Sequence, residues 1–216
     1  MPEETVRVPL AGQDGVTAIL TRPQGQPGDW LFIYAPGAGS NVHDGFGAFA
    51  CRHLAAHGFT ALRFQFPDME ARRRRPDRPA VLQETWTRVV ETFRASLKLV
   101  IGGRSMGGRI ASQIVAQGTE VDALALFAYP LHAPGPGSQW RDQHLPAIGA
   151  PTLFCSGTRD AFATPEELRQ AASGMPQSSV HILEGADHGF ATLKSGGRTR
   201  EEVWAEAVAA MMDWLP

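Results

Sequence analysis

Short apolar runs alternate with longer segments of helical periodicity along nearly the whole chain, and this alternation limits the folds that it can adopt. A continuous apolar run of about five residues is typical of a strand buried on both faces. Apolar residues three and four apart indicate amphipathic helices between these runs. We expect strands over residues 5–10, 16–22, 30–35, 60–64, 97–102, 123–129, 152–156 and 179–183, and helices over residues 46–57, 81–97, 106–117, 165–172 and 201–215.

Strand–helix alternation predicts a mostly parallel central sheet of about eight strands with helices on both faces, because parallel neighbours need a crossover connection. The first two strands, joined by a turn over residues 12–15, are expected at the edge of this sheet. A chain of 216 residues has the length of one domain, which we place at residues 1–216. Sheet and helices nearly exhaust it, so we expect no lid domain. The irregular stretches 67–79 and 130–150 are then left to form the walls of any pocket.

Composition excludes several classes of protein. Hydrophobic residues make up 43% of the chain and charged residues 19%, which excludes a disordered chain. The formal net charge of −2 gives no general attraction to nucleic acid or to an anionic membrane, so neither is expected as a partner. No secretory signal pattern is visible, and Cys51 and Cys155 lack metal-binding or redox spacing, so we expect a cytoplasmic protein with buried thiols. The oligomeric state is left open.

The motif G-x-S-x-G occurs once between a predicted strand and a predicted helix, at residues 103–107. A strand-to-helix elbow of this kind holds its serine in a strained conformation with the hydroxyl exposed. The glycines are needed because side chains there would collide with the neighbouring strand and helix. Ser105 is therefore the candidate nucleophile, the alternative being an ordinary glycine-rich turn.

A serine hydroxyl needs a base to remove its proton, and the base needs a carboxylate to orient it. In folds with such an elbow the chain order is serine, acid, histidine. Asp160 follows the predicted strand 152–156, and His188 follows the predicted strand 179–183. Ligands bind beyond the carboxyl ends of the strands in open parallel sheets. We therefore expect Ser105, Asp160 and His188 to meet at that edge.

Other histidines and acids fit this order less well. His181 lies inside a predicted strand, and His144 comes before the position that the order requires. Asp187 adjoins His188 directly and is expected to be a turn or surface residue.

A tetrahedral intermediate also needs hydrogen-bond donors for its oxyanion. The expected donors are the backbone N–H groups of Met106, directly after the serine, and of Ala38, in the turn after the third strand. Gly37 and Gly39 on either side would let this turn direct its amides inward. The turn lacks the Lys-Ser/Thr ending of a nucleotide-binding loop, which argues against nucleotide binding. Hydrolysis by a serine, a histidine and an aspartate requires neither a cofactor nor a metal, so we expect neither.

The chain resembles the α/β-hydrolases over nearly its whole length. More narrowly, it resembles a small family that includes a testis-expressed α/β-hydrolase-like protein and a subunit of a histone-acetyltransferase complex. This resemblance implies the α/β-hydrolase fold and a Ser105–Asp160–His188 triad, and names no substrate. The chain is more distantly similar to dienelactone hydrolases, which have cysteine where Ser105 stands, and Pro36 stands where many esterases have histidine. The segments that carry the resemblance are residues 35–39, 63–73, 102–109, 129–132, 157–160 and 187–190.

Arginines near the predicted site give two interpretations. A run of four arginines at residues 72–75 lies after the fourth strand. Three arginines are candidates for contact with an anionic substrate, because arginine binds oxyanions with paired hydrogen bonds: Arg72, Arg73 and Arg104. Gly37, in the turn after the third strand, is a further candidate for substrate contact. The alternative is a solvated loop balanced by nearby acidic residues. Arg109 is expected on the surface of its helix.

These observations favour a serine hydrolase that cleaves a small ester or thioester. Two alternatives stay open: a non-catalytic interaction or scaffold protein that keeps the fold, and a small peptidase. The absence of an insertion for a lid favours short acyl chains.

Overall fold

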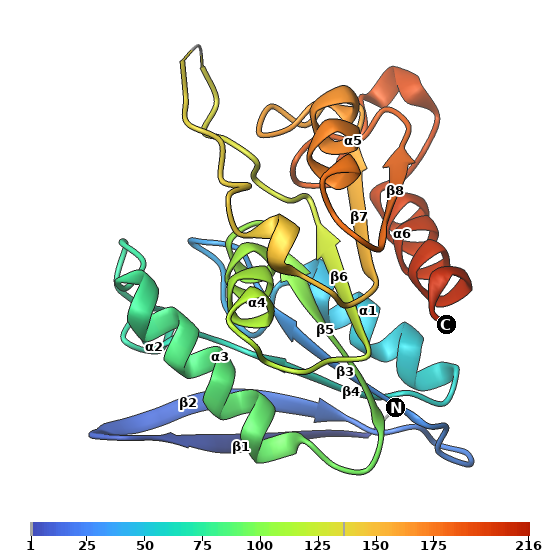
Figure 1. The fold of residues 1–216 in the computed structure, drawn as a ribbon. Helices are drawn as coiled ribbons and strands as arrows, with labels where there is room; N and C mark the ends of the chain where they lie inside the picture. Colours follow the sequence, from blue (N-terminus) through green and yellow to red (C-terminus); the bar gives the residue numbers. More distant parts are fainter. Residues whose placement is uncertain (1, 136) are drawn as a thin grey trace.

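A computed structural model describes residues 2–135 and 137–216, and its centre is a sheet of eight strands (Figure 1). The strand order across the sheet is β1-β2-β4-β3-β5-β6-β7-β8. All neighbours from β4 to β8 are parallel, so the predicted fold class is confirmed. The strands are β1 (Glu3–Leu10), β2 (Gln13–Thr21), β3 (Trp30–Ala35), β4 (Thr60–Phe64), β5 (Lys98–Arg104), β6 (Ala123–Phe127), β7 (Thr152–Gly157) and β8 (Ser178–Leu183).

The first two strands form an antiparallel hairpin, but only β1 lies at the edge of the sheet. β2 also pairs with β4, from Ala18 opposite Phe64 to Thr21 opposite Ala61. The expectation of two edge strands was therefore wrong for β2. Residues 16–21 of β2 are mostly buried, as expected of a strand that has a hydrogen-bonded neighbour on each side.

Helices cover both faces of the sheet. Figure 1 shows α3 and α4 in front of the strands, with α1 and α6 behind them. The front layer includes the fully buried Trp86 of α3, whose indole N–H donates to the carbonyl of Gly107 in α4 at 3.1 Å. The helices are α1 (Gly45–Ala56), α2 (Pro67–Glu70), α3 (Pro79–Phe93), α4 (Met106–Ala116), α5 (Pro165–Ser173) and α6 (Arg200–Trp214), with the 3₁₀ turns η1 (Leu145–Ala147) and η2 (Lys194–Gly196).

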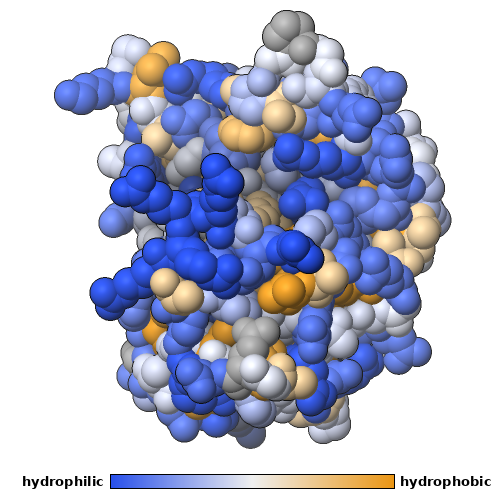
Figure 2. Space-filling model, turned by 90° about the vertical axis from the view of Figure 1, so that its left-hand side faces the viewer, coloured by the Kyte–Doolittle hydropathy of each residue, from blue (hydrophilic) through white to orange (hydrophobic). Residues whose placement is uncertain are grey.

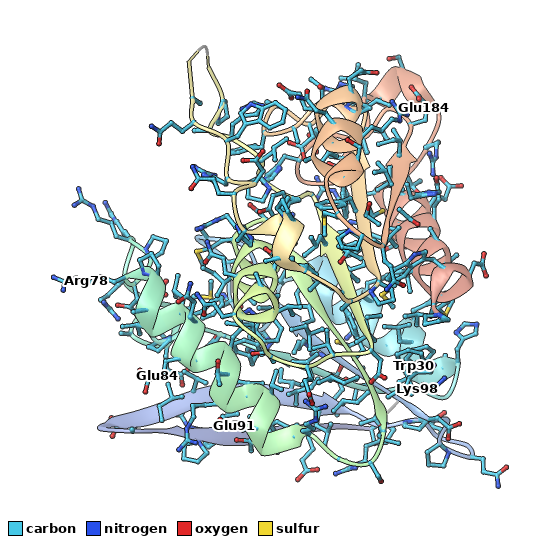
Figure 3. All side chains as sticks on the ribbon, viewed as in Figure 1. Trp30, Arg78, Glu84, Glu91, Lys98 and Glu184 are labelled. Carbon is cyan, nitrogen blue, oxygen red and sulfur yellow. The ribbon has the colours of Figure 1, made fainter. Side chains whose placement is uncertain are left out.

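The parallel strands all begin at one end of the sheet and finish at the other. Trp30 and Lys98 begin β3 and β5, and the Lys98 ammonium lies 5.3 Å from the centre of the Trp30 ring. Figure 3 shows this pair at the opposite end of the molecule from Glu184, which comes directly after β8. The carboxyl ends of the parallel strands therefore gather at one end of the sheet, where the predicted site residues lie.

The helix that follows β4 was not predicted from the sequence. Residues 67–70 form the single turn α2, which begins with proline at its first position. Proline suits the first turn of a helix because the N–H that it lacks has no partner there. The segment between β6 and β7, as far as the structure describes it, contains only η1. In residues 2–135 and 137–216, no helix combines the length and the apolar character that a bilayer crossing requires.

The close packing of β5 against β6 gives a first test of the fold. A Cβ atom on Gly102 would lie less than 3.0 Å from the carbonyl oxygen of Ala125. We expect Gly102→Ala to lower the free energy of unfolding by about 2–4 kcal/mol, because backbone atoms of a buried sheet have no room to move. Chemical denaturation measures this change. Gly149→Ala is the matched control, since nothing lies within 4 Å of its Cβ position, and it should change stability by no more than about 0.5 kcal/mol.

Candidate active site

Ser105 occupies the junction between β5 and α4 in a conformation that side-chain-bearing residues rarely adopt. Its φ is +53° and its ψ is −117°. Its backbone N–H donates to the carbonyl of Phe127 at 2.9 Å, which ties the junction to the end of β6. Such strain persists only where the surrounding structure enforces it, and it is concentrated at functional sites.

Two glycines allow this junction to pack against β3. A Cβ atom on Gly103 or on Gly107 would lie less than 3.0 Å from the carbonyl oxygen of Ala35, the last residue of β3. Any side chain at either position would push the elbow away from the loop that follows β3. The spacing of the motif is therefore a packing requirement, as the sequence predicts.

Ser105, His188 and Asp160 form a continuous chain of hydrogen bonds. The Nε2 atom of His188 lies 2.9 Å from the Ser105 hydroxyl oxygen, and its Nδ1 atom lies 2.9 Å from both carboxylate oxygens of Asp160. An ionised carboxylate only accepts hydrogen bonds, so the Nδ1–H of His188 donates to it and Nε2 is left to accept from the serine hydroxyl. The structure thus brings together the three side chains that chain order alone had grouped.

The Asp160 carboxylate is fully enclosed and well bonded. Its side chain has no exposed surface, whereas that of His188 is 26% exposed. The hydroxyl of Ser156 donates to Oδ2 at 3.0 Å, and the backbone N–H of Phe162 donates to Oδ1 at 2.8 Å. Buried carboxylates of this kind are tolerated because their oxygens are paired.

Phe162 also fixes the orientation of the histidine, a role that the sequence does not reveal. Its ring stacks on the His188 imidazole with centroids 4.1 Å apart and planes inclined by 30°. Asp187, by contrast, is the turn residue that we expected. Its Oδ1 atom accepts the backbone N–H groups of Gly189 and Ala191, and it makes no bond to the imidazole among the described residues.

Backbone N–H groups lie close to the serine on two sides. Met106 is the first residue of α4, a position whose N–H has no partner within the helix. Gly37 and Ala38 belong to a turn closed by the Ser40 N–H, which donates to the Gly37 carbonyl at 3.2 Å. A Cβ atom on Gly37 would lie 3.4 Å from the Ser105 Cβ atom, so this turn approaches the serine closely. Met106, Gly37 and Ala38 all line the same cavity as Ser105.

That cavity has a volume of about 690 Å³, within the range of small-molecule sites. The predicted walls are confirmed, since residues 76–79 and 130–144 supply much of the lining. Figure 2 views the face that carries the segment after β4 and shows strongly hydrophilic residues around a hollow. The lining residues are Gly37, Ala38, Pro76, Asp77, Pro79, Leu82, Arg104, Ser105, Met106, Arg109, Gln113, Pro130, Gln139, Trp140, Arg141, Gln143, His144, Phe162 and His188.

Two of the four candidate substrate contacts lie outside this lining, which corrects the expectation for them. Arg72 is exposed to solvent, and Arg73 is held by Asp77, whose two oxygens accept Nη1 and Nη2 at 2.7 Å each. The turn after α2 places the arginine run on the outer side of the wall. Figure 3 shows Arg78, just before α3, also extending outward.

The other two candidates, Gly37 and Arg104, do line the cavity. Arg104 donates from Nη2 to Oδ1 of Asp44, the residue before α1, at 3.1 Å. Asp44 also accepts the Tyr34 hydroxyl at 2.6 Å and caps α1 through the Gly47 N–H. The charge of Arg104 is therefore balanced within the protein.

Arg109, Arg141 and His144 line the cavity although sequence reasoning assigned them no role there. Arg109 was expected on the helix surface, but it is partly buried. Burial is the main cause that lowers the pKa of its guanidinium, and the nearby charge of Arg141 lowers it further. A signal was present for Arg109, which stands four residues after Ser105, in the first turn of the predicted helix. Arg141 and His144 lie in an irregular stretch, where spacing carries no such information.

Among the described residues, the cysteines and the acidic side chains form no reactive or metal-binding group apart from the triad. Burial raises the pKa of the Cys51 thiol to about 12 and also raises that of the Cys155 thiol. Both thiols are free and buried. Across the part of the chain that the structure describes, no three His, Cys, Asp or Glu side chains are grouped as metal ligands would be.

A family model described as an alpha/beta hydrolase domain matches residues 28–216. The chain belongs to this alpha/beta hydrolase family. The match covers the elbow, the buried acid and the histidine, together with every strand of the parallel part of the sheet.

Solved structures of similar fold agree over nearly the whole chain. An alpha-beta serine hydrolase homologue from Coxiella burnetii superposes with a TM-score of 0.76 at 18% identity, covering 97% of each chain. A dienelactone hydrolase from Anabaena variabilis gives a TM-score of 0.75 at 22% identity, covering 100% of this chain and 99% of that one. XC6422 from Xanthomonas campestris, described as a serine hydrolase without lid, gives 0.71 at 20% identity, with 100% and 97% covered. These likenesses show the α/β-hydrolase fold.

The strain at the elbow predicts an unusual ranking of two substitutions. Glycine adopts positive φ without a penalty, so Ser105→Gly should be more stable than Ser105→Ala by about 1–2 kcal/mol. Thermal unfolding of both variants measures the difference. Ser112, in the middle of α4, is the matched control: there the glycine variant should be less stable than the alanine variant by about 1 kcal/mol. The same ranking at both positions would contradict strain at Ser105.

Proposed function

We propose that the protein is a serine hydrolase that cleaves a small ester or thioester through an acyl-enzyme intermediate. The observation that carries this proposal is the unbroken chain of hydrogen bonds from the Ser105 hydroxyl through His188 to the buried Asp160. A scaffold would have no need of such a chain opening into a cavity. The narrower resemblance to the testis-expressed and acetyltransferase-subunit family stays a prediction and assigns no substrate.

In the first half of the reaction, Nε2 of His188 takes the hydroxyl proton as the Ser105 oxygen attacks the carbonyl carbon of the substrate. Asp160 keeps Nδ1–H directed toward itself and stabilises the imidazolium that forms. Phe162 holds the imidazole plane between its two partners. The imidazolium then returns its proton to the leaving alcohol or thiol as the tetrahedral intermediate collapses.

The negative charge of the tetrahedral intermediate falls on the former carbonyl oxygen. The N–H groups of Met106 and Ala38 would donate to it from the elbow and from the facing turn, which approaches the Ser105 side chain closely at Gly37. The start of α4 adds the positive end of a helix dipole. Because these donors are fixed before substrate binds, no reorganisation is needed when the charge develops.

In the second half, His188 removes a proton from water as the water oxygen attacks the acyl group. Collapse of the second intermediate breaks the bond to Ser105, whose oxygen takes the proton back from His188, and releases the carboxylic acid. The reaction needs no metal or organic cofactor. The exposed edge of His188 and the cavity beside it give water access.

A fluorophosphonate probe tests the nucleophile directly. We expect it to label Ser105 in the wild-type protein and to leave Ser105→Ala unlabelled, as intact-mass spectrometry and peptide mapping would show. Asp160→Asn should lower kcat by about a thousandfold to ten-thousandfold, because the amide no longer holds the imidazole in the required tautomer. A folded wild-type protein that remains unlabelled and inert towards esters would overturn the proposal.

The composition of the cavity predicts a preference among acyl chains. Its wall includes Arg109, Arg141 and three glutamines, and a long alkyl chain would have to displace water from these polar groups without replacing their hydrogen bonds. We expect kcat/KM for p-nitrophenyl butyrate to exceed that for the dodecanoate by about tenfold or more. Initial rates below the micellar concentration measure the ratio, and equal rates would contradict the prediction.

A further inference from the structure

The cavity beside Ser105 contains positive charge that the protein itself does not neutralise. Arg109 forms no ion pair or side-chain hydrogen bond with any described residue. Among the same residues, the only such bond of Arg141 is from Nη1 to the backbone carbonyl of Pro130 at 3.4 Å. Neither guanidinium therefore meets a carboxylate of the described chain.

The other charges at the cavity cancel in pairs. Asp77 is the one acidic side chain among the described lining residues, and Arg73 binds both of its oxygens. Arg104 is paired with Asp44. Arg109 and Arg141 are thus the charges left over, and both face the space in which a substrate of Ser105 must lie.

The backbones of both arginines are held in place by the surrounding structure. Arg109 belongs to α4, and its backbone N–H donates to the Ser105 carbonyl at 3.0 Å. The Arg141 backbone is fixed on both sides, since its N–H donates to the Leu131 carbonyl at 2.7 Å and its carbonyl accepts the Tyr129 hydroxyl at 2.7 Å. The points from which the two side chains extend are therefore set before a ligand arrives.

Partial burial makes this uncompensated charge costly. Burial lowers the pKa of Arg109, and the neighbouring Arg141 charge opposes its protonated state as well. His144 stands in the same wall, where its Nε2 atom lies 2.7 Å from the Ser112 hydroxyl, and burial together with Arg109 lowers its pKa. Two cations brought together in a partly desolvated wall without a counter-ion are destabilising unless a ligand supplies the missing negative charge.

We propose that Arg109 and Arg141 form a binding subsite for an anionic group, a carboxylate or a phosphate, carried by the ester or thioester substrate. This inference rests on the proposed hydrolase function and names its substrate class. Guanidinium groups bind such oxyanions through paired, charge-assisted hydrogen bonds.

The position of Arg109 limits the length of the substrate. Arg109 lies in the first turn of α4, which begins directly after Ser105, and both residues line the same cavity. An anionic group bound by Arg109 is then only a few carbon atoms away from the carbonyl carbon that Ser105 attacks. A short dicarboxylic half-ester fits this distance, as does a short acyl thioester whose leaving group bears phosphate.

Two matched substrate pairs separate the sources of negative charge. Mono-p-nitrophenyl glutarate and p-nitrophenyl valerate have acyl chains of equal length and differ in the terminal carboxylate. The butyryl thioesters of 2-mercaptoethyl phosphate and of 2-mercaptoethanol differ in the phosphate group on the leaving thiol. We expect wild-type kcat/KM to be higher for the anionic member of one of these pairs by about 10- to 100-fold.

Substitutions then test which arginines are responsible. Arg109→Gln and Arg141→Gln should each lower kcat/KM for the anionic member by about 10-fold or more beyond any change for the neutral member. Arg109→Lys keeps the charge and should retain part of the preference. Arg72→Gln is the matched control on the outer arginine run, and it should leave both substrates unchanged.

A binding measurement makes the subsite testable without turnover. Calorimetric titration of glutarate, or of 2-mercaptoethyl phosphate, into the Ser105→Ala protein should show binding that Arg109→Gln weakens by about 10-fold or more. Turnover of the neutral ester without any anionic preference, and without anion binding, would overturn the subsite and leave the hydrolase proposal standing. Anion binding that depends on Arg109 in a protein inert towards every ester would support the subsite and overturn the hydrolase proposal. Equal losses for anionic and neutral esters in Arg109→Gln would also overturn the subsite, since they indicate a structural role.

Discussion

The close approach of the β5–α4 elbow to the end of β3 is the constraint on which the site depends. The Ala35 carbonyl lies where a Cβ atom on Gly103 or Gly107 would have to be, so the two glycines let three backbone segments meet. This packing holds Ser105 at positive φ and turns its hydroxyl toward the cavity. It also brings the Ala38 turn beside Met106. Nucleophile and candidate oxyanion donors thus share one structural cause.

The second half of the site depends on burial instead of strain. Asp160 and His188 follow adjacent parallel strands, β7 and β8, whose carboxyl ends lie together by the topology of the sheet. Ser156 and Phe162 complete the bonding of the carboxylate, so the imidazole meets a fixed acceptor. Because the two halves are held by different strands, the register from β5 through β6 and β7 to β8 determines whether the serine and the histidine meet.

Sequence reasoning succeeds where a residue type has only one physical explanation. Glycines flanking a serine between an apolar run and a helix indicated the elbow, and strand order placed Asp160 and His188 at the same edge. It fails where a contact depends on how an irregular segment turns. The single helical turn α2 moves Arg72 and Arg73 to the outside of the wall, and the segment after β6 places Arg141 inside it. Phe162 belongs to the same class, since no periodicity marks an aromatic ring that stacks on a histidine.

The arginine run still bears on the cavity, although by an indirect route. Asp77 lies in the wall and would cancel part of the charge of Arg109 or Arg141 if it were free. Arg73 binds both of its oxygens, so this carboxylate is already paired within the protein. Exposed ion pairs contribute little to stability, but this one leaves Arg109 and Arg141 without a free carboxylate in the cavity wall. In the proposed anion subsite, an arginine outside the pocket thus has a role, because it pairs the acid that would otherwise oppose an anionic ligand.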